Sequence, residues 1–145
     1  MSAPVFYVDA SVIAGIALRD IDLERLVATV PVDVAFAYST FGFGEVVSAI
    51  AARIRATHGC DEDGSSRIND LRKFLKNWIW MDWTSGDLDR AVALTARVSL
   101  ALKLPDAIHI AIAERLDFPL LTLDRQQHRA ASTLGLASVF PAISG

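Results

Sequence analysis

The sequence predicts an α/β fold with three layers, α/β/α, built on a mostly parallel central sheet and carrying a helical hairpin. Short β-branched or aromatic runs alternate with apolar residues spaced as in amphipathic helices, which is typical of parallel sheets covered on both faces. The chain has 145 residues, 52% of them hydrophobic, and no Pro-, Gly- or Ser-rich stretch divides it. We therefore expect one domain spanning residues 1–145.

The first part of the chain is expected to alternate strands with helices. Residues 5–8 and 34–37 have the β-branched and aromatic composition of strands. A helical pattern follows Ser11, and a short helix is expected to start near Asp22. Residues 40–57 then form a long amphipathic pattern, which predicts the longest helix of the chain.

A helical hairpin is expected next. The polar stretch 58–66 is interpreted as a loop that leads to a helix marked by Ile68, Leu71 and Leu75. The remaining expected elements are a strand at 78–83, a helix capped by Asp87, a helix opened by Pro105, a strand at 120–123, a helix at 126–134 and a strand at 137–140.

Two aspartates follow strands at positions where such sheets form their sites. In open parallel sheets, ligands bind outside the carboxyl ends of the strands, where successive connections turn to opposite faces. Asp9 directly follows the first expected strand, and Asp124 follows the strand at 120–123. We expect both carboxylates at the same edge of the sheet.

Composition indicates the cellular compartment of the protein and how it could bind nucleic acid. Cys60 is the only cysteine, so an internal disulfide is excluded, and the N-terminus lacks a signal-peptide pattern. No run approaches the roughly 18 apolar residues of a membrane-spanning helix, so we expect a soluble, cytoplasmic protein that does not bind membranes. The net charge of −3 means that nucleic acid would be bound through a local basic patch.

Four carboxylates have unusually apolar neighbours in the sequence, and they belong to Asp9, Glu45, Asp106 and Asp124. A buried ionised carboxylate needs a counter-charge, hydrogen bonds or a metal, and no Lys or Arg occupies a comparably apolar position. Mg²⁺ or Mn²⁺ is the expected partner, because these ions prefer oxygen ligands and bridge to phosphates. This chemistry suits hydrolysis of phosphodiester bonds.

Each acid also has a purely structural interpretation. Asp9 can cap the helix near Ser11, and Asp106 can interact with the dipole of its own helix. Asp124 can be a turn residue, and Glu45 can face solvent on a polar helix stripe. The functional interpretation depends on all four acids occurring where strand ends and flanking helices can converge.

Thr122 is expected to support the site. It lies two residues before Asp124, so along a strand its hydroxyl projects to the same side and can orient a carboxylate or a metal-bound water. An ordinary β-branched strand residue is the other interpretation.

The acids and their neighbours resemble a known family. The segments are Asp9-Ala-Ser-Val-Ile after the first strand, Glu45 in a central helix, Leu-Pro-Asp106-Ala-Ile-His-Ile-Ala, and Leu-Thr-Leu-Asp124. In this order they resemble the PIN domain, in particular the single-domain ribonuclease toxins of the VapC type. The resemblance covers nearly the whole chain, and the segment around Asp106 is its most specific part.

The resemblance implies an endoribonuclease that depends on Mg²⁺ or Mn²⁺. Asp9, Asp106 and Asp124 would bind the metal, Glu45 would complete the catalytic set, and water would attack phosphorus to leave a 5′-phosphate and a 3′-hydroxyl. The resemblance also implies a homodimer inhibited by a cognate VapB-like antitoxin, received near residues 51–74.

The chain departs from the family pattern at two places. Many members carry Asn two residues after the first Asp, whereas Ser11 stands here and offers one fewer functional group. Gly42 and Gly44 precede Glu45 in a helix, where glycine is unfavourable. Either they permit close backbone approach, or the helix starts later than residue 40.

Other residues are candidates for RNA binding or catalysis. His109 follows Asp106 by three residues, and its apolar neighbours favour a core histidine with satisfied hydrogen bonds. Trp78, Trp80 and Trp83 can stack on bases, although aromatic strands more often pack in a core or dimer interface. Candidate RNA contacts are Arg53, Lys103, Arg125 and Arg129, each of which can equally be a solvated surface residue.

Two other functions remain open. An aspartate-based phosphatase also places Asp at the end of the first strand, but it usually has a second Asp two residues on, where Ser11 stands. A non-catalytic binding module with a PIN fold is the other alternative. The retention of all four acids argues against a decayed site.

Overall fold

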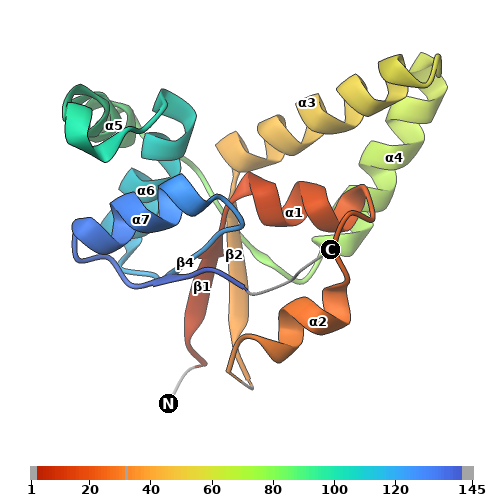
Figure 1. Ribbon diagram of the computed structural model, residues 1–145. Coiled ribbons are helices and arrows are strands. Elements are labelled where there is room, and N and C mark those ends of the chain that lie inside the picture. Colours follow the sequence, from red (N-terminus) through yellow and green to blue (C-terminus); the bar gives the residue numbers. More distant parts are fainter. Residues whose placement is uncertain (1–2, 32, 142–145) are drawn as a thin grey trace.

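The computed structural model describes residues 3–31 and 33–141, and Figure 1 shows a central sheet between two layers of helices. The sheet has five strands in the order β3-β2-β1-β4-β5, and every pairing between them is parallel. This confirms the expected three-layer α/β class. The strands are β1 (Val5–Val8), β2 (Ala35–Ser39), β3 (Ile79–Met81), β4 (Leu120–Leu121) and β5 (Ser138–Val139).

A helix is present for each helical pattern of the sequence, and a short 3-10 helix (Val98–Leu100) is added. No helix within the described ranges has the length and apolar character needed to cross a bilayer. The α-helices are α1 (Ala10–Ala17), α2 (Leu23–Ala28), α3 (Thr40–Ala56), α4 (Asp61–Phe74), α5 (Ser85–Ala96), α6 (Leu104–Leu116) and α7 (Arg125–Thr133).

Alternate residues of β1 enter two separate cores. Phe6 and Val8 pack with α1, α2, α3 and α4 on one face, whereas Tyr7 packs with α5, α6 and α7 on the other. The helices that connect β1 to β2 and β2 to β3 cover one face of the sheet. The helices that connect β3 to β4 and β4 to β5 cover the other face, so the change of face falls between the neighbouring strands β1 and β4. The ends of these two strands are therefore the switch point of the sheet.

The hairpin of α3 and α4 projects beyond the sheet (Figure 1). Its loop is shorter than expected, because α4 begins at Asp61 and most of the stretch 58–66 is helical. The backbone N–H of Cys60 donates to the carboxylate of Asp63 at 2.8 Å, and Asp61, Glu62 and Asp63 all favour the positive end of the helix. The three acids, which we interpreted as part of a polar loop, therefore stabilise the N-terminus of α4.

Asp87 also differs from its prediction. Thr84, not Asp87, is the N-cap of α5, and the two residues form a reciprocal capping box. The side chain of Asp87 is 2% exposed and accepts hydrogen bonds from Arg115 at 2.8 and 3.0 Å. The ion pair joins α5 to α6 and supplies the counter-charge that burial requires.

Gly42 permits a close approach between α3 and α6. A β-carbon at this position would lie 3.1 Å from Cε1 of His109 and 3.3 Å from the hydroxyl of Ser39. Gly44 has nothing within 4 Å of such an atom. The helix does start at Thr40, so close approach is the explanation for Gly42.

The two glycines make a matched pair for a stability measurement. Gly42→Ala should lower the free energy of unfolding by about 1–3 kcal/mol, because the His109 ring must shift. Gly44→Ala should raise it by about 0.5–1 kcal/mol through helix propensity alone. Urea denaturation followed by circular dichroism measures both, and equal effects of the two substitutions would contradict the close approach.

Candidate active site

Asp9 is both a helix cap and a buried carboxylate. It is the N-cap of α1, accepting from the backbone N–H of Val12 at 3.3 Å, and its side chain is 2% exposed. The hydroxyls of Ser11 and Thr122 donate to its two oxygens, each at 2.6 Å. Burial raises the pKa of this carboxyl, while His109 and these hydrogen bonds oppose the rise.

Ser11 and Thr122 tie the ends of β1 and β4 together. The hydroxyl of Ser11 accepts from the backbone N–H of Leu123 at 3.0 Å, and that of Thr122 accepts from the backbone N–H of Asp124 at 3.0 Å. Thr122 is fully buried and orients Asp9 rather than the carboxylate of Asp124. Both hydroxyls therefore position the start of α1 against the end of β4.

Asp124 lies across the switch point from Asp9. It is the N-cap of α7, where its Oδ1 accepts from the backbone N–H groups of Gln126 and Gln127 at 2.9 and 3.0 Å. Its Oδ2 has no hydrogen bond to any residue that the structure describes. One oxygen thus holds the helix, and the other is available to a ligand.

Asp106 lies in the first turn of α6 and is half-buried. Its side chain makes no hydrogen bond or ion pair within residues 3–31 and 33–141. Burial, followed by repulsion from Asp124, raises the pKa of Asp106 to about 6; Asp9 and Glu45 add to the rise and His109 opposes it. The four acids therefore share one electrostatic environment.

Glu45 is positioned by a chain of buried polar groups. Its Oε1 is bonded to Nε2 of His109, whose Nδ1 lies 2.6 Å from the hydroxyl of Tyr7. The Tyr7 hydroxyl lies 2.8 Å from that of Ser39, which accepts from the backbone N–H of Gly42 at 2.9 Å. Glu45 itself stays partly exposed, at 32% of its side chain.

The hydrogen bonds of this chain can all run in one direction. Gly42 donates to Ser39, so the Ser39 hydroxyl is able to donate to Tyr7 and Tyr7 to Nδ1 of His109, which leaves the proton on Nε2 to face Glu45. Burial raises the pKa of the Tyr7 hydroxyl far above its ordinary value, so it remains a donor. His109 is a buried histidine with both nitrogens bonded, as interpreted from the sequence, and it also holds a candidate catalytic acid.

Sequence reasoning missed Tyr7, Ser39 as a relay, and Gln127. Gln127 is fully buried, donates to the backbone carbonyl of Asp106 at 3.3 Å, and leaves its Oε1 without a partner among the described residues. Tyr7 lies two residues before Asp9 and so faces the same side of β1, which is the one signal the sequence offered.

The candidate RNA contacts are not all near the acids. Lys103 precedes α6 and Arg125 opens α7, so each adjoins an element that carries an acid. The guanidinium of Arg125 lies over the ring of Phe140, 5.2 Å from its centroid. Arg129 is exposed on α7, whereas Arg53 pairs with Asp20 at 3.1 Å on the far part of α3.

The acids fit a cation that keeps much of its own water. Within the described ranges, no three Asp, Glu, His or Cys side chains form a ready-made metal cage. Mg²⁺ usually takes only one or two carboxylates directly and retains waters. Asp106 and one oxygen of Asp124 lack hydrogen-bond partners there, and repulsion among the acids would be relieved by a positive ion.

Solved structures share this fold at low sequence identity. VapBC-1 from nontypeable Haemophilus influenzae has a TM-score of 0.67 at 10% identity, covering 94% of this chain and 97% of that chain. A toxin-antitoxin complex from Klebsiella pneumoniae has a TM-score of 0.61 at 22% identity, with coverages of 94% and 97%. VapC20 from Mycobacterium tuberculosis, described as a sarcin-ricin loop cleaving toxin, has a TM-score of 0.64 at 17% identity, with coverages of 94% and 99%.

The sequence itself identifies the family. Comparison with curated proteins finds no match. The family model of the PIN domain, however, matches residues 6–132, a span that runs from β1 to α7 and includes all four acids. The chain belongs to the PIN domain family.

Proposed function

We propose that this chain is a divalent-metal-dependent endoribonuclease and the toxin of a toxin-antitoxin pair. The observation that carries this proposal is the gathering of Asp9, Glu45, Asp106 and Asp124 around the switch point, where the charges of the other three acids add to burial in raising the pKa of Asp106. Membership of the PIN family and the printed names of the structural neighbours support it.

The metal would be Mg²⁺ or Mn²⁺, held by Asp106 and Asp124 with Asp9 beside them. When bound, such an ion lowers the pKa of a coordinated water and stabilises charge on phosphate oxygens. Hydroxyl bonds from Ser11 and Thr122 keep Asp9 in one orientation. His109 keeps Glu45 at the edge of the site, where its second oxygen is able to accept a proton from the attacking water.

The reaction is hydrolysis of an RNA phosphodiester bond. A bond forms between the water oxygen and phosphorus while the bond from phosphorus to the 3′ oxygen breaks. The products are a 5′-phosphate and a 3′-hydroxyl, and the 2′-hydroxyl takes no part.

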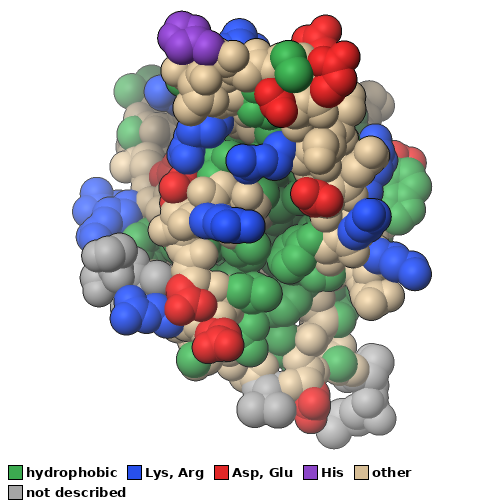
Figure 2. Space-filling view, turned by 90° about the vertical axis from the view of Figure 1, so that its right-hand side faces the viewer, with side chains coloured by type: hydrophobic (Ala, Val, Ile, Leu, Met, Phe, Trp, Pro, Cys, Tyr) green, Lys and Arg blue, Asp and Glu red, His purple; other side chains and the backbone are tan. Residues whose placement is uncertain are grey.

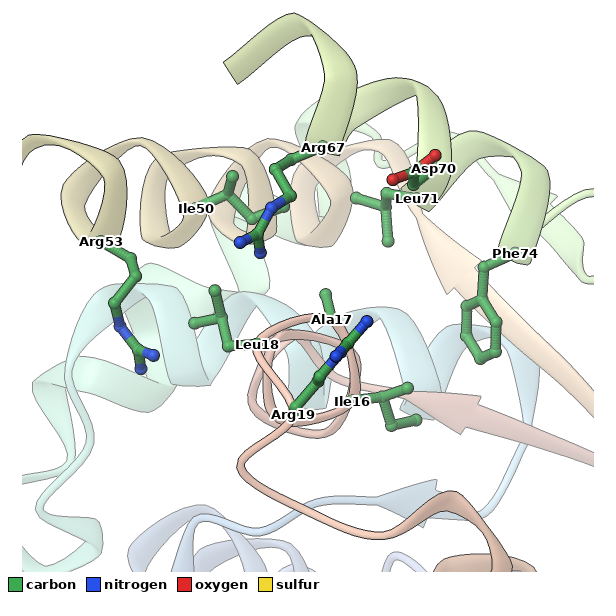
Figure 3. Close-up of a pocket in the computed structure, with 10 residues that line it drawn as sticks. All are labelled: Ile16, Ala17, Leu18, Arg19, Ile50, Arg53, Arg67, Asp70, Leu71 and Phe74. Atoms are coloured by element: carbon green, nitrogen blue, oxygen red, sulfur yellow. The ribbon is translucent and has the colours of Figure 1, made fainter. Parts of the chain in front are cut away.

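An antitoxin is proposed to dock in the groove between the end of α1 and the α3–α4 hairpin, whose cavity volume is about 430 Å³. Ile16, Leu18 and Phe74 contribute apolar surface, and Figure 2 shows apolar side chains gathered on this face between Lys and Arg side chains. Arg53 and Arg67 reach into the same space from the hairpin (Figure 3). An apolar segment that also carries carboxylates fits this groove.

The groove lies close enough to the acids for one segment to reach both. Ile50 lines the groove and Glu45 lies five residues earlier on the same helix, about 7.5 Å along its axis. Homodimer formation stays a prediction.

RNA cutting tests the nuclease directly. Purified chain, freed of any antitoxin, should cut a mixed RNA pool with Mg²⁺ or Mn²⁺ and not with EDTA, measured on denaturing gels. Asp9→Ala and Asp106→Ala should each reduce the rate by at least about a hundredfold, whereas Asp89→Ala on the exposed side of α5 should not. Cutting that survives EDTA or both substitutions would exclude the four-acid mechanism.

The Asp106 carboxyl should make stability depend on pH and metal. Its pKa is about 6 in the folded chain against an ordinary 3.8, so the folded chain binds more protons between these values. The free energy of unfolding therefore falls as pH rises from about 4 to about 6. In EDTA at pH 7.5, Asp106→Asn should raise the Tm by a few degrees, and this gain should vanish near pH 4.

Metal should reverse that difference. Adding Mg²⁺ at pH 7.5 should raise the Tm of the wild type and leave that of Asp106→Asn nearly unchanged, because a bound ion stabilises only the folded state. Differential scanning calorimetry measures both quantities, with Asp89→Asn as the control. If neither Mg²⁺ nor Mn²⁺ changes the Tm of the wild type, the proposed metal site is contradicted.

Charge reversal in the groove should release the nuclease from inhibition. The antitoxin captured from source cells on tagged Asp106→Asn chain should suppress RNA cutting when added to the wild type. Arg67→Glu should cut RNA normally and resist that suppression by at least about tenfold in inhibitor concentration. Arg97→Glu, an exposed arginine at the end of α5, is the matched control. Equal inhibition of both variants would place the antitoxin elsewhere.

A further inference from the structure

A second pocket, distinct from the groove, opens beside the outer strand β3, with a cavity volume of about 390 Å³. This size falls in the range of ordinary ligand sites. Its lining residues are Tyr38, Thr40, Phe43, Arg72, Leu75, Lys76, Trp78 and Trp80. Aromatic and cationic side chains dominate this set, and no acid lines the pocket among the described residues.

One aromatic wall of the pocket is fixed and the other is open. Trp78 packs against Phe36 and Phe74, with ring centroids 5.1 and 5.5 Å apart. Trp80 pairs with Tyr38 in the sheet register, is 57% exposed, and has no ring contact among the described residues. An indole face on a rigid strand is therefore available to a planar ligand.

Two cationic side chains, Arg72 and Lys76, line the pocket. The guanidinium of Arg72 lies 4.8 Å from the centroid of the Phe43 ring, and Lys76 lies in the turn that follows the end of α4. Thr40, which also lines the pocket, donates to the carboxylate of Asp82 at 3.5 Å. An anion is thus favoured next to Arg72 and Lys76 and disfavoured next to Asp82.

We propose that this pocket binds one nucleotide of a single-stranded RNA, with its base stacked on Trp80 and its phosphate held by Arg72 and Lys76. The inference rests on the proposed ribonuclease function, because it assigns a place to the part of the substrate that flanks the cut. Stacking on aromatic rings beside a basic surface is how proteins hold single strands without reading their sequence.

The pocket lies at the same end of the sheet as the acids. Tyr38 and Thr40 flank Ser39, which is bonded to Tyr7 in the chain that leads to Glu45. β3 lies two strand positions from β1, about 10 Å away. One RNA strand is therefore able to contact the pocket and the acids together.

A second copy of this chain is the less favoured occupant. A twofold contact through this face would bring Arg72 and Lys76 towards their own counterparts, since such interfaces pair the same patch on both subunits. Like charges facing each other oppose that association, whereas phosphate groups complement them.

Binding of a non-cleaved oligonucleotide separates the pocket from catalysis. The probe is fluorescein-labelled decauridylate, titrated with the full chain in EDTA and followed by fluorescence anisotropy. Trp80→Ala should weaken binding about 5- to 150-fold and Trp80→Phe much less, because one base loses its stacking surface. Lys76→Ala should reduce the slope of log affinity against log salt by about 0.7.

Trp83→Ala is the matched control. Trp83 is also an exposed tryptophan, at 40%, but it packs against Phe41 with centroids 5.8 Å apart and does not line the pocket. Its removal should leave decauridylate affinity unchanged. The inference is overturned if the wild type does not bind, if Trp80→Ala and Trp83→Ala behave alike, or if size-exclusion chromatography shows that Trp80→Ala merely separates a dimer.

Cutting assays keep this inference apart from the proposed function. RNA cutting that is normal in Trp80→Ala, with kcat/KM unchanged on long and short substrates, would overturn the pocket and leave the nuclease. Decauridylate binding that depends on Trp80, in a chain that cuts nothing, would support the pocket and remove the nuclease. A raised KM on long substrates alone, with kcat unchanged, supports both.

Discussion

The buried carboxylate of Asp9 is the constraint on which the rest of the structure depends. An ionised group at this depth is strongly destabilising unless its oxygens are bonded, and Ser11, Thr122 and the backbone of Val12 supply those bonds. Thr122 is 113 positions away in the sequence, so folding must bring the end of β4 to the start of α1. The pairing of β1 with β4 therefore also brings Thr122 to Asp9.

Hydrogen bonds do not stabilise all four acids in this arrangement. The bonds to Asp9 and the helix cap at Asp124 satisfy two carboxylates, while Asp106 has no bonded partner within the described ranges, and burial followed by repulsion from Asp124 raises its pKa. A chain selected only for stability would replace such a group with a neutral one. A half-buried carboxyl that has no hydrogen-bonded partner among the described residues and is repelled by Asp124 is a physical argument for a ligand that is positively charged.

Local patterns revealed the acids but not their partners. Apolar neighbours marked Asp9 and Asp106 as buried, and strand ends placed Asp9 and Asp124 together, because both signals lie within a few residues. The contact of Tyr7 with His109 joins positions 102 apart, and nothing in a single sequence pairs them. The prediction for Asp87 was wrong for the same reason. Its sequence context indicates a helix cap, and nothing near it in the sequence indicates the buried ion pair with a residue of another helix.

His109 connects the two helical layers at the site. It lies on α6, which covers one face of the sheet, and it holds Glu45 on α3, whose buried residues pack on the other. The contact passes over the ends of β1 and β2, where Tyr7 and Ser39 fix the far side of the ring. Any change in how either layer packs on the sheet must therefore move Glu45 relative to Asp9. The absence of a side chain at Gly42 allows α3 and the ring to approach closely enough for this contact, so a residue without chemistry of its own determines where an acid can act.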